Sequence, residues 1–251
     1  MSKDIAVVVG AGGDIGQHIA EALVNAGQKV IGIGRSIDST SFLTERFGVD
    51  CFHSLAVDIS SDSAVEVISA ALDAPVSMVV HSAGVPVAGG VSTVSTEAIA
   101  NAFNIKVNGF IRLVRGVQNR LRKQSRLVAI GGHYGFEPSP YAATAGVANA
   151  ALANLVRQMS WAYGPHGITA HLVAPGPADT DRLRRVAADR AKASGSTVDA
   201  QLDAMRAESA IGALTDPKAV GWAVAMLLSP YADAMAGASL FLDAGRRKGL
   251  P

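Results

Sequence analysis

The sequence predicts an α/β protein with a doubly wound, parallel, seven-stranded sheet, in a single domain over residues 1–251. Three observations favour this fold class. Short apolar segments rich in β-branched residues alternate with segments of helical periodicity along the whole chain, as in a sheet covered by helices on both faces. A glycine-rich turn joins the first strand to the first helix. No linker, low-complexity segment or repeat divides the 251 residues into parts.

The first βαβ unit sets the pattern. Ile5–Val9 is a continuous apolar run, which is typical of a strand buried on both faces. Apolar residues then recur at helical spacing from Ile15 to Ala26, and Gly27 ends the helix. Lys29–Ile33 is the second strand, so the connection should be right-handed and the two strands parallel.

The alternation continues to the end of the chain. Five further strands are expected, at Phe52–Val57, Val76–Val80, Leu127–Ile130, Ile168–Val173 and Ser239–Leu242. Helices are expected at residues 61–72, 96–121 and 141–163, as two helices within 181–209, and at 216–228 with Pro217 in the first turn. Seven strands separated by helices complete a doubly wound sheet.

The composition argues against several classes of function. The net charge is +1, so nothing indicates a basic surface for nucleic acid. No apolar run is long enough to span a bilayer, and the first residues lack the basic and apolar regions of a signal peptide. The histidines are not accompanied by carboxylates or by Cys51 at metal-ligand spacing. We therefore expect a soluble, cytoplasmic protein with no membrane or nucleic-acid partner and no metal site.

The turn after the first strand reads Gly-Ala-Gly-Gly-Asp-Ile-Gly and leads into a helix. Glycines let a backbone approach a ligand closely, and a helix N-terminus offers N–H groups and partial positive charge to a pyrophosphate. The context therefore predicts a dinucleotide-binding Rossmann fold. We expect Asp14 to cap the helix and meet a ribose hydroxyl rather than to repel the diphosphate. The residues expected to contact the dinucleotide here are Gly10, Gly12, Gly13, Asp14, Ile15 and Gly16.

The ordered set of motifs resembles the short-chain dehydrogenase/reductase family over nearly the whole chain. Gly10 and Gly16 match the family motif Thr-Gly-x-x-x-Gly-x-Gly, although Val9 and Asp14 replace its Thr and its middle Gly. The resemblance implies an NAD(P)-dependent oxidoreductase that acts on a small molecule and assembles as a homotetramer or homodimer. The further matches are Asp58 with Ile59 at the adenine, Ser82, Ala83 and Gly84 against the cofactor, Asn108 on the catalytic helix, Pro175, Gly176 and Thr180 at the nicotinamide, and Asp243-Ala244-Gly245 near the end.

The end of the second strand decides between NADP and NAD. An acidic residue there would accept the ribose 2′-hydroxyl, whereas an arginine suits a 2′-phosphate. The sequence reads Gly-Ile-Gly-Arg-Ser, without an acid at this point. Arg35 and Ser36 therefore favour NADP, with NAD as the alternative. If Arg35 is only a solvated surface cation, it carries no such preference.

The family's chemistry, as the resemblance implies it, uses Asn, Ser, Tyr and Lys, the last two spaced Tyr-x-x-x-Lys. Tyr141 is the matching tyrosine, which is also expected to contact the cofactor, but Ala145 stands at the Lys position. Gly132 or Gly131 stands at the Ser position. One Lys charge about 4 Å away contributes roughly 4 kcal/mol at an effective dielectric near 20, which is about what brings a phenol of pKa ~10 to neutrality. Reduction of a carbonyl or imine, for which a neutral Tyr141 can donate its proton, should suffer less from this loss than alcohol oxidation.

Other side chains are weaker candidates for the reacting centre. Asn108, in Ile-Lys-Val-Asn-Gly, resembles the family's catalytic Asn. His133 is a candidate general acid because histidine titrates near neutrality, although a loop histidine that points to solvent is the simpler interpretation. Lys106 lies two positions from Asn108, so it belongs to a different helix face and is not expected to replace the missing Lys. Tyr141 itself either donates the proton or packs against the sheet without function.

Residues 181–213 follow the Pro-Gly turn at the C-terminal edge of the sheet and are expected to form a lid over the substrate pocket. Arg182 and Arg190 are expected on a solvated helix face rather than in a clamp for a charged substrate. Three functions remain, in order of preference. The first is an NADP-dependent reductase with Tyr141 as proton donor, the second a non-redox cyclase or isomerase that keeps the cofactor as structure, and the third a cofactor-binding pseudoenzyme.

Overall fold

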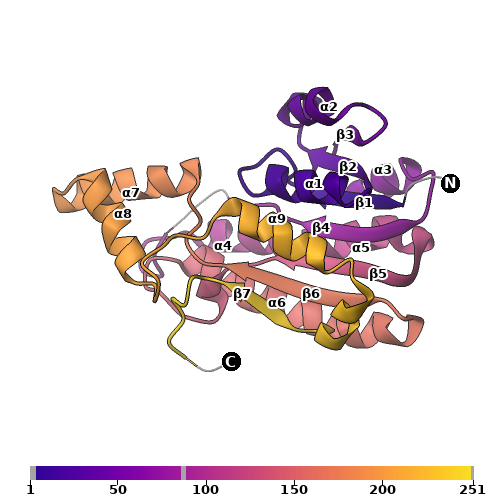
Figure 1. Cartoon of the computed structure of the whole chain (residues 1–251). Coiled ribbons are helices and arrows are strands. Elements are labelled where there is room, and N and C mark those ends of the chain that lie inside the picture. Colours follow the sequence, from indigo (N-terminus) through magenta and orange to yellow (C-terminus); the bar gives the residue numbers. More distant parts are fainter. Residues whose placement is uncertain (1–3, 86–88, 250–251) are drawn as a thin grey trace.

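The computed structural model describes residues 4–85 and 89–249, and Figure 1 shows how their elements are arranged. At the centre is a parallel sheet of seven strands in the order β3-β2-β1-β4-β5-β6-β7. This order confirms the predicted doubly wound sheet, because the chain runs outward from β1 to β3, crosses over, and runs outward again from β4. The strands are β1 (Ile5–Val9), β2 (Lys29–Gly34), β3 (Phe52–Ala56), β4 (Val76–His81), β5 (Leu121–Ile130), β6 (Thr169–Pro175) and β7 (Ser239–Leu242).

Helices cover both faces of the sheet. The helices are α1 (Gly16–Asn25), α2 (Ser41–Phe47), α3 (Ala64–Ala70), α4 (Thr96–Phe103), α5 (Gly109–Val117), α6 (Ala143–Tyr163), α7 (Asp181–Ser194), α8 (Val198–Ala207) and α9 (Pro217–Met226). α1 and α9 pack on one face, and α3, α5 and α6 on the other. α7 and α8 extend beyond the end of the sheet (orange in Figure 1). None of the helices in the described ranges is both long and apolar enough to cross a bilayer.

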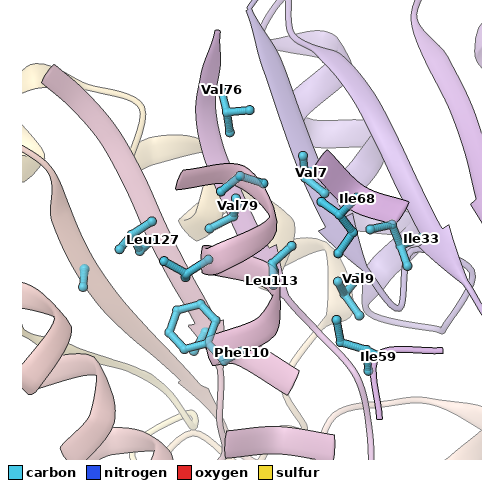
Figure 2. Packing of buried hydrophobic residues seen from close by; sticks show 14 of the residues in the cluster. Val7, Val9, Ile33, Ile59, Ile68, Val76, Val79, Phe110, Leu113 and Leu127 are labelled. Atoms are coloured by element: carbon cyan, nitrogen blue, oxygen red, sulfur yellow. The ribbon is translucent and has the colours of Figure 1, made fainter. Parts of the chain in front are cut away.

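Alternate residues of each strand enter different cores. Val7 and Val9 of β1 pack with Phe110 and Leu113 of α5 (Figure 2), whereas Val8 belongs to the cluster beneath α1 and α9. Burying one such side chain contributes about 1.5–3 kcal/mol. Because both faces are covered, the strand keeps an uninterrupted apolar sequence instead of alternating with polar residues.

Several elements differ from the sequence prediction, among them β5, which begins at Leu121 instead of Leu127. The helical segment expected at 96–121 is present without a break to Arg120, but it contains a π-helical turn, Asn104–Asn108, between α4 and α5, and a 3-10 turn follows α5. The helix α2 was not predicted, since its seven residues give too few repeats of an apolar face to be recognised. The π-helical turn matters for the site, because it carries the buried Lys106.

Candidate functional site

Close backbone contacts shape the glycine loop between β1 and α1. Gly10 has a φ of 77°, in the left-handed region that favours glycine. A Cβ on Gly16 would lie 1.9 Å from the carbonyl oxygen of Gly10, and a Cβ on Gly12 would lie 1.8 Å from that of Ser39. The fold therefore requires glycine at these three positions.

The start of α1 presents unpaired amides. The N-cap residue is Ile15 and no side chain caps the helix. The expectation that Asp14 caps α1 is wrong, because the helix begins one residue too late for such a cap. The amides of Asp14 and Ile15 donate to no acceptor in the part of the chain that the structure describes. Together with the positive end of the helix dipole, they provide donors for a phosphate group.

The expected adenosine end lies after β2 and β3. Arg35 and Ser36 are both exposed. Asp58 accepts hydrogen bonds from the Ser60 hydroxyl at 2.6 Å and the Ser60 amide at 2.9 Å. These bonds, helped by the charge of Arg35, lower the pKa of the Asp58 carboxyl. Ile59 is buried, and its side chain packs in the core.

A cavity of about 280 Å³ lies at the carboxyl ends of β4, β5 and β6, bounded on one side by residues of α7 and α8. This is the edge of the sheet where doubly wound folds bind ligands. The cavity brings together these predicted site residues: Ile15, Ser82, Ala83, Gly84, His133, Tyr141, Pro175, Gly176 and Thr180. Its lining does not include Gly10, Gly12, Gly13, Asp14, Gly16, Arg35, Ser36, Asp58, Ile59 or Asn108.

Tyr141 stands at the mouth of the cavity, just before α6. Its side chain is 69% exposed, and the Arg190 guanidinium lies 5.7 Å from the centre of its ring. Ala145, one helical turn later, also lines the cavity. The predicted tyrosine therefore reaches the site, and no amine follows it at the fourth position along the helix.

The space beside Gly132 is already filled. A Cβ on Gly132 would lie 2.9 Å from Nδ2 of Asn149. Asn149 is buried on α6, lines the cavity, and its Oδ1 has no hydrogen-bond partner among the described residues. No motif or spacing in the sequence pointed to Asn149. The side-chain amide of Asn149 lies where a side chain at residue 132 would project.

The segment between α4 and α5 reverses the expectation for Lys106 and Asn108. Asn108 is exposed, and its Nδ2 donates to Asn104 Oδ1 at 3.4 Å, so the expectation that Asn108 faces the reacting centre is wrong. Lys106 is buried, lines the cavity, and donates from Nζ to the carbonyl oxygen of Ile130 at 3.0 Å. The two residues do lie on different faces, as expected, but the inward one is Lys106.

His81, at the end of β4, supports this arrangement. Its Nε2 lies 2.9 Å from the carbonyl oxygen of Ile105, inside the π-helical turn. Burial lowers the pKa of His81 to about 3, so the ring is neutral and this nitrogen donates. A Cβ on Gly109 would lie 3.1 Å from Cε1 of the same ring. The imidazole therefore packs directly on the turn that carries Lys106.

His133 is buried rather than exposed, which corrects the simpler of its two sequence interpretations. Its ring centre lies 4.0 Å from that of Tyr134. Burial lowers the pKa of His133 to about 4, so the ring is neutral near pH 7. Its Nε2 has no hydrogen-bond partner in the described residues. A neutral ring of low pKa is a poor general acid, but it can hydrogen-bond a ligand.

The charged side chains in the described lining of the cavity are positive, while the carboxylates of Asp243 and Glu137 lie near His133 and favour its charged form. The lining contains Lys106, Arg182 and Arg190 and no Asp or Glu. Arg184, on the same helix α7, instead pairs with Asp179 at 2.7 Å. Arg182 is exposed, as expected for a solvated helix face, and Arg190 is half-buried, but both also line the cavity. Within residues 4–85 and 89–249, no group of three or more His, Cys, Asp or Glu is placed to hold a metal ion.

Comparisons with known proteins agree with this geometry. Residues 10–247 match the family model described as enoyl-(acyl carrier protein) reductase. The 3-oxoacyl-(acyl-carrier-protein) reductases of Vibrio cholerae and Pseudomonas aeruginosa are 26% and 27% identical over 246 and 249 residues, with 96% of each chain covered. The structure of L-sorbose reductase from Gluconobacter frateurii with NADPH and L-sorbose gives a TM-score of 0.88 at 22% identity, covering 99% of this chain and 98% of that one. A 3-oxoacyl (acyl-carrier-protein) reductase from Agrobacterium tumefaciens with NADP bound gives 0.83 at 24% identity, covering 96% and 93%.

Proposed function

The chain belongs to the short-chain dehydrogenase/reductase family, and from this premise we propose that it is an NADP-dependent reductase of a small carbonyl or imine compound. The observation that carries the proposal is the single cavity that gathers Ser82–Gly84, Pro175–Gly176 and Tyr141 at the switch point of the sheet. Residues 181–213 act as its lid, since α7 and α8 supply part of the wall. The reactions named for the relatives, reductions of 3-oxoacyl groups, support the same reaction class.

The described residues fit a nicotinamide dinucleotide. The unpaired amides of Asp14 and Ile15 suit a diphosphate, and the cavity beyond them contains three cations and no carboxylate. When bound, the reduced nicotinamide supplies a hydride with its electron pair. The chain's own residues must then orient the substrate, stabilise the charge that forms on it and deliver a proton.

Arg35 is expected to set the preference for NADP. Replacing it (Arg35→Ala) should weaken NADPH binding about 10- to 100-fold, because a charge-assisted hydrogen bond to a phosphate contributes ~1.5–3 kcal/mol. NADH binding should not change, since NADH lacks the 2′-phosphate. Fluorescence titration of both nucleotides measures this, with the exposed Arg157→Ala as the control. Equal losses for NADPH and NADH would assign Arg35 no part in the choice.

Tyr141 is proposed as the proton donor. The Tyr141→Phe variant should lower the rate of NADPH-dependent reduction by about 10²- to 10⁴-fold, the range for loss of a general acid, while NADPH affinity stays the same. Tyr231→Phe, at an 88% exposed position, is the matched control. Steady-state rates with a panel of aldehydes, ketones and cyclic imines provide the measurement. Unchanged turnover would remove Tyr141 from the mechanism.

Because Ala145 and Gly132 replace the Lys and Ser that the family resemblance implies, two other functions must also be tested. Conversion of a substrate without any loss of NADPH absorbance would favour a non-redox enzyme that retains the cofactor as structure. Nucleotide binding without turnover of any compound would favour a pseudoenzyme. We further propose that the protein acts in the cytoplasm and that it assembles as a homotetramer or homodimer. Light scattering of the purified protein would test the assembly.

A further inference from the structure

Lys106 is a buried ammonium group inside the cavity that the family resemblance does not account for. It is 6% exposed, and its Nζ reaches the carbonyl oxygen of Ile130 at the end of β5. That carbonyl precedes Gly131 and Gly132, which also line the cavity. The amine therefore lies at the base of the space where the resemblance expects the substrate oxygen to be held, but it comes from a different helix than the expected lysine.

The positive charge of Lys106 has no carboxylate partner in the described part of the chain. An ammonium has three donors, and among residues 4–85 and 89–249 only the bond to Ile130 uses one of them. Arg182 and Arg190 add to the positive potential of the same cavity. A buried, unpaired cation is unfavourable unless negative charge compensates it. The site is thus built for negative charge that arrives with the substrate or develops on it.

We propose that Lys106 donates a hydrogen bond to the reacting oxygen of the substrate, so that the substrate is a ketone or aldehyde and not an imine. This inference rests on the proposed reductase function. Hydride transfer to a carbonyl carbon moves the π electron pair onto oxygen, where the ammonium stabilises it. A cyclic imine is reduced most readily as its iminium cation, which the three cations of this cavity repel.

The proposed reduction balances with groups that the protein, the cofactor and water supply. The carbonyl carbon gains the hydride, and the nicotinamide that supplies it is oxidised. The oxygen keeps the former π electrons and takes one proton from the Tyr141 hydroxyl. Tyr141 recovers its proton from water, to which it is largely exposed. Lys106 remains charged throughout, so it does the work of the two functions missing at Gly132 and Ala145: oxygen binding and positive charge.

The surroundings of Lys106 make the proposed carbonyl reduction depend on pH. His81 on β4 and Arg182 on α7 face the amine, and His133, Tyr141 and Arg190 line the same cavity. Burial, helped by the charge of Arg182, lowers the pKa of Lys106 to about 8. The ammonium is therefore mostly present at pH 7, and it is lost as the pH rises above 8.

Paired carbonyl and imine probes test the inference on the full chain with NADPH. The carbonyl probe is 2,3-butanedione and the imine probe is 2-methyl-1-pyrroline. Lys106→Met should lower carbonyl reduction roughly 100- to 1,000-fold, the cost of losing one oxyanion donor, with no loss of any imine reduction. Lys106→Arg keeps the charge, so it should retain more carbonyl activity and lose the decline above pH 8. Lys192→Met, at an exposed position on α7, is the control.

A binding measurement provides a second readout. Isobutyramide has a carbonyl oxygen but is not reduced, and its affinity for the NADPH complex should fall about 10-fold or more in Lys106→Met, consistent with a lost hydrogen bond to a charged group. NADPH affinity should stay unchanged, which shows that the variant is folded. Carbonyl reduction by Lys106→Met at the parent rate, or reduction of the imine alone by the parent protein, would overturn the inference but leave a reductase. Reduction of neither probe class by the parent would refute the reductase and the inference together.

Discussion

The folded protein is expected to lose stability steeply as the pH falls from 6.5 towards 4. Three histidines are buried: His81, His133 and His171. Burial lowers the pKa of each from 6.5, to about 3 for His81 and to about 4 for His133 and His171. A nearby cation adds to each effect, namely Lys106, Arg246 and Arg126 in that order.

The direction of this change in stability follows from how many protons the folded and unfolded states bind. Below pH 6.5 the unfolded chain takes up protons on these imidazoles, whereas the folded chain stays neutral there until about pH 4. The unfolded state therefore binds more protons across this window, and stability falls with falling pH. With all three groups titrating only when unfolded, the slope is about 4 kcal/mol per pH unit. A domain with a free energy of unfolding of about 5–15 kcal/mol cannot withstand that slope for long.

Urea unfolding followed by circular dichroism at several values between pH 7 and pH 5 measures this slope. Most carboxylates remain ionised in that interval, so the histidines dominate it. His171→Gln should reduce the slope by about a third, whatever it does to the absolute stability, because one proton is removed from the difference. His53→Gln, at an exposed position, should leave the slope unchanged. A free energy of unfolding that stays constant from pH 7 to pH 5 would contradict the prediction.

The sequence was sufficient for the architecture, because alternation of apolar strands with amphipathic helices is a property of the chain itself. Each of the seven expected strands is present, and the glycine loop lies where the pattern put it. The loop's glycines were expected to serve the ligand, yet Gly12 and Gly16 are also required by backbone oxygens of Ser39 and Gly10. These glycines thus satisfy two constraints, the approach of a ligand and the close packing of the backbone. The sequence alone does not show which of the two requires glycine.

The reacting centre was harder to predict, because it depends on which face of one helix turns inward. Lys106, Gly109, Phe110 and Leu113 share a face at helical spacing, and all four are buried. Counting back from Phe110 and Leu113 would have placed Lys106 inside. The motif resemblance instead drew attention to Asn108, which lies on the opposite face. The π-helical turn, which no sequence pattern predicts, then adds the local shift that packs this segment on His81.

Buried contacts between distant segments were also out of reach of the sequence. The two glycines before His133 favour a loop histidine that points to solvent, but its ring is buried and packs on Tyr134. Asn149 has an ordinary position within α6, and only the missing side chain of Gly132 gives its amide access to the cavity. Both placements depend on how the loop after β5 folds back on α6, a tertiary relation without a local signal.

Replacement of Arg126 is expected to be among the most damaging single changes to the fold. Arg126 lies on β5 and is completely buried. Its guanidinium donates to the carbonyl oxygens of Leu227 at 2.7 Å and Ser229 at 3.1 Å and to Thr169 Oγ1 at 3.0 Å. It also pairs with the half-exposed Asp233 at 2.7 Å. One side chain therefore ties the middle of the sheet to the end of α9 and to the turn before β7.

Arg126→Met keeps the length of the side chain but removes every donor. Buried carbonyl oxygens then lose their partners, at about 1–3 kcal/mol each, and the total cost should be about 3–5 kcal/mol, as for a broken buried ion pair. Arg126→Lys should recover only part of this, because a single ammonium cannot reproduce the planar fork. Arg122→Met is the matched control, because Arg122 also lies on β5 but forms only an exposed ion pair with Asp4. Its loss should cost under about 1 kcal/mol. Urea midpoints at pH 7 compare the three. A loss for Arg126→Met no larger than that of the control would show that the C-terminal turn holds its position without the guanidinium.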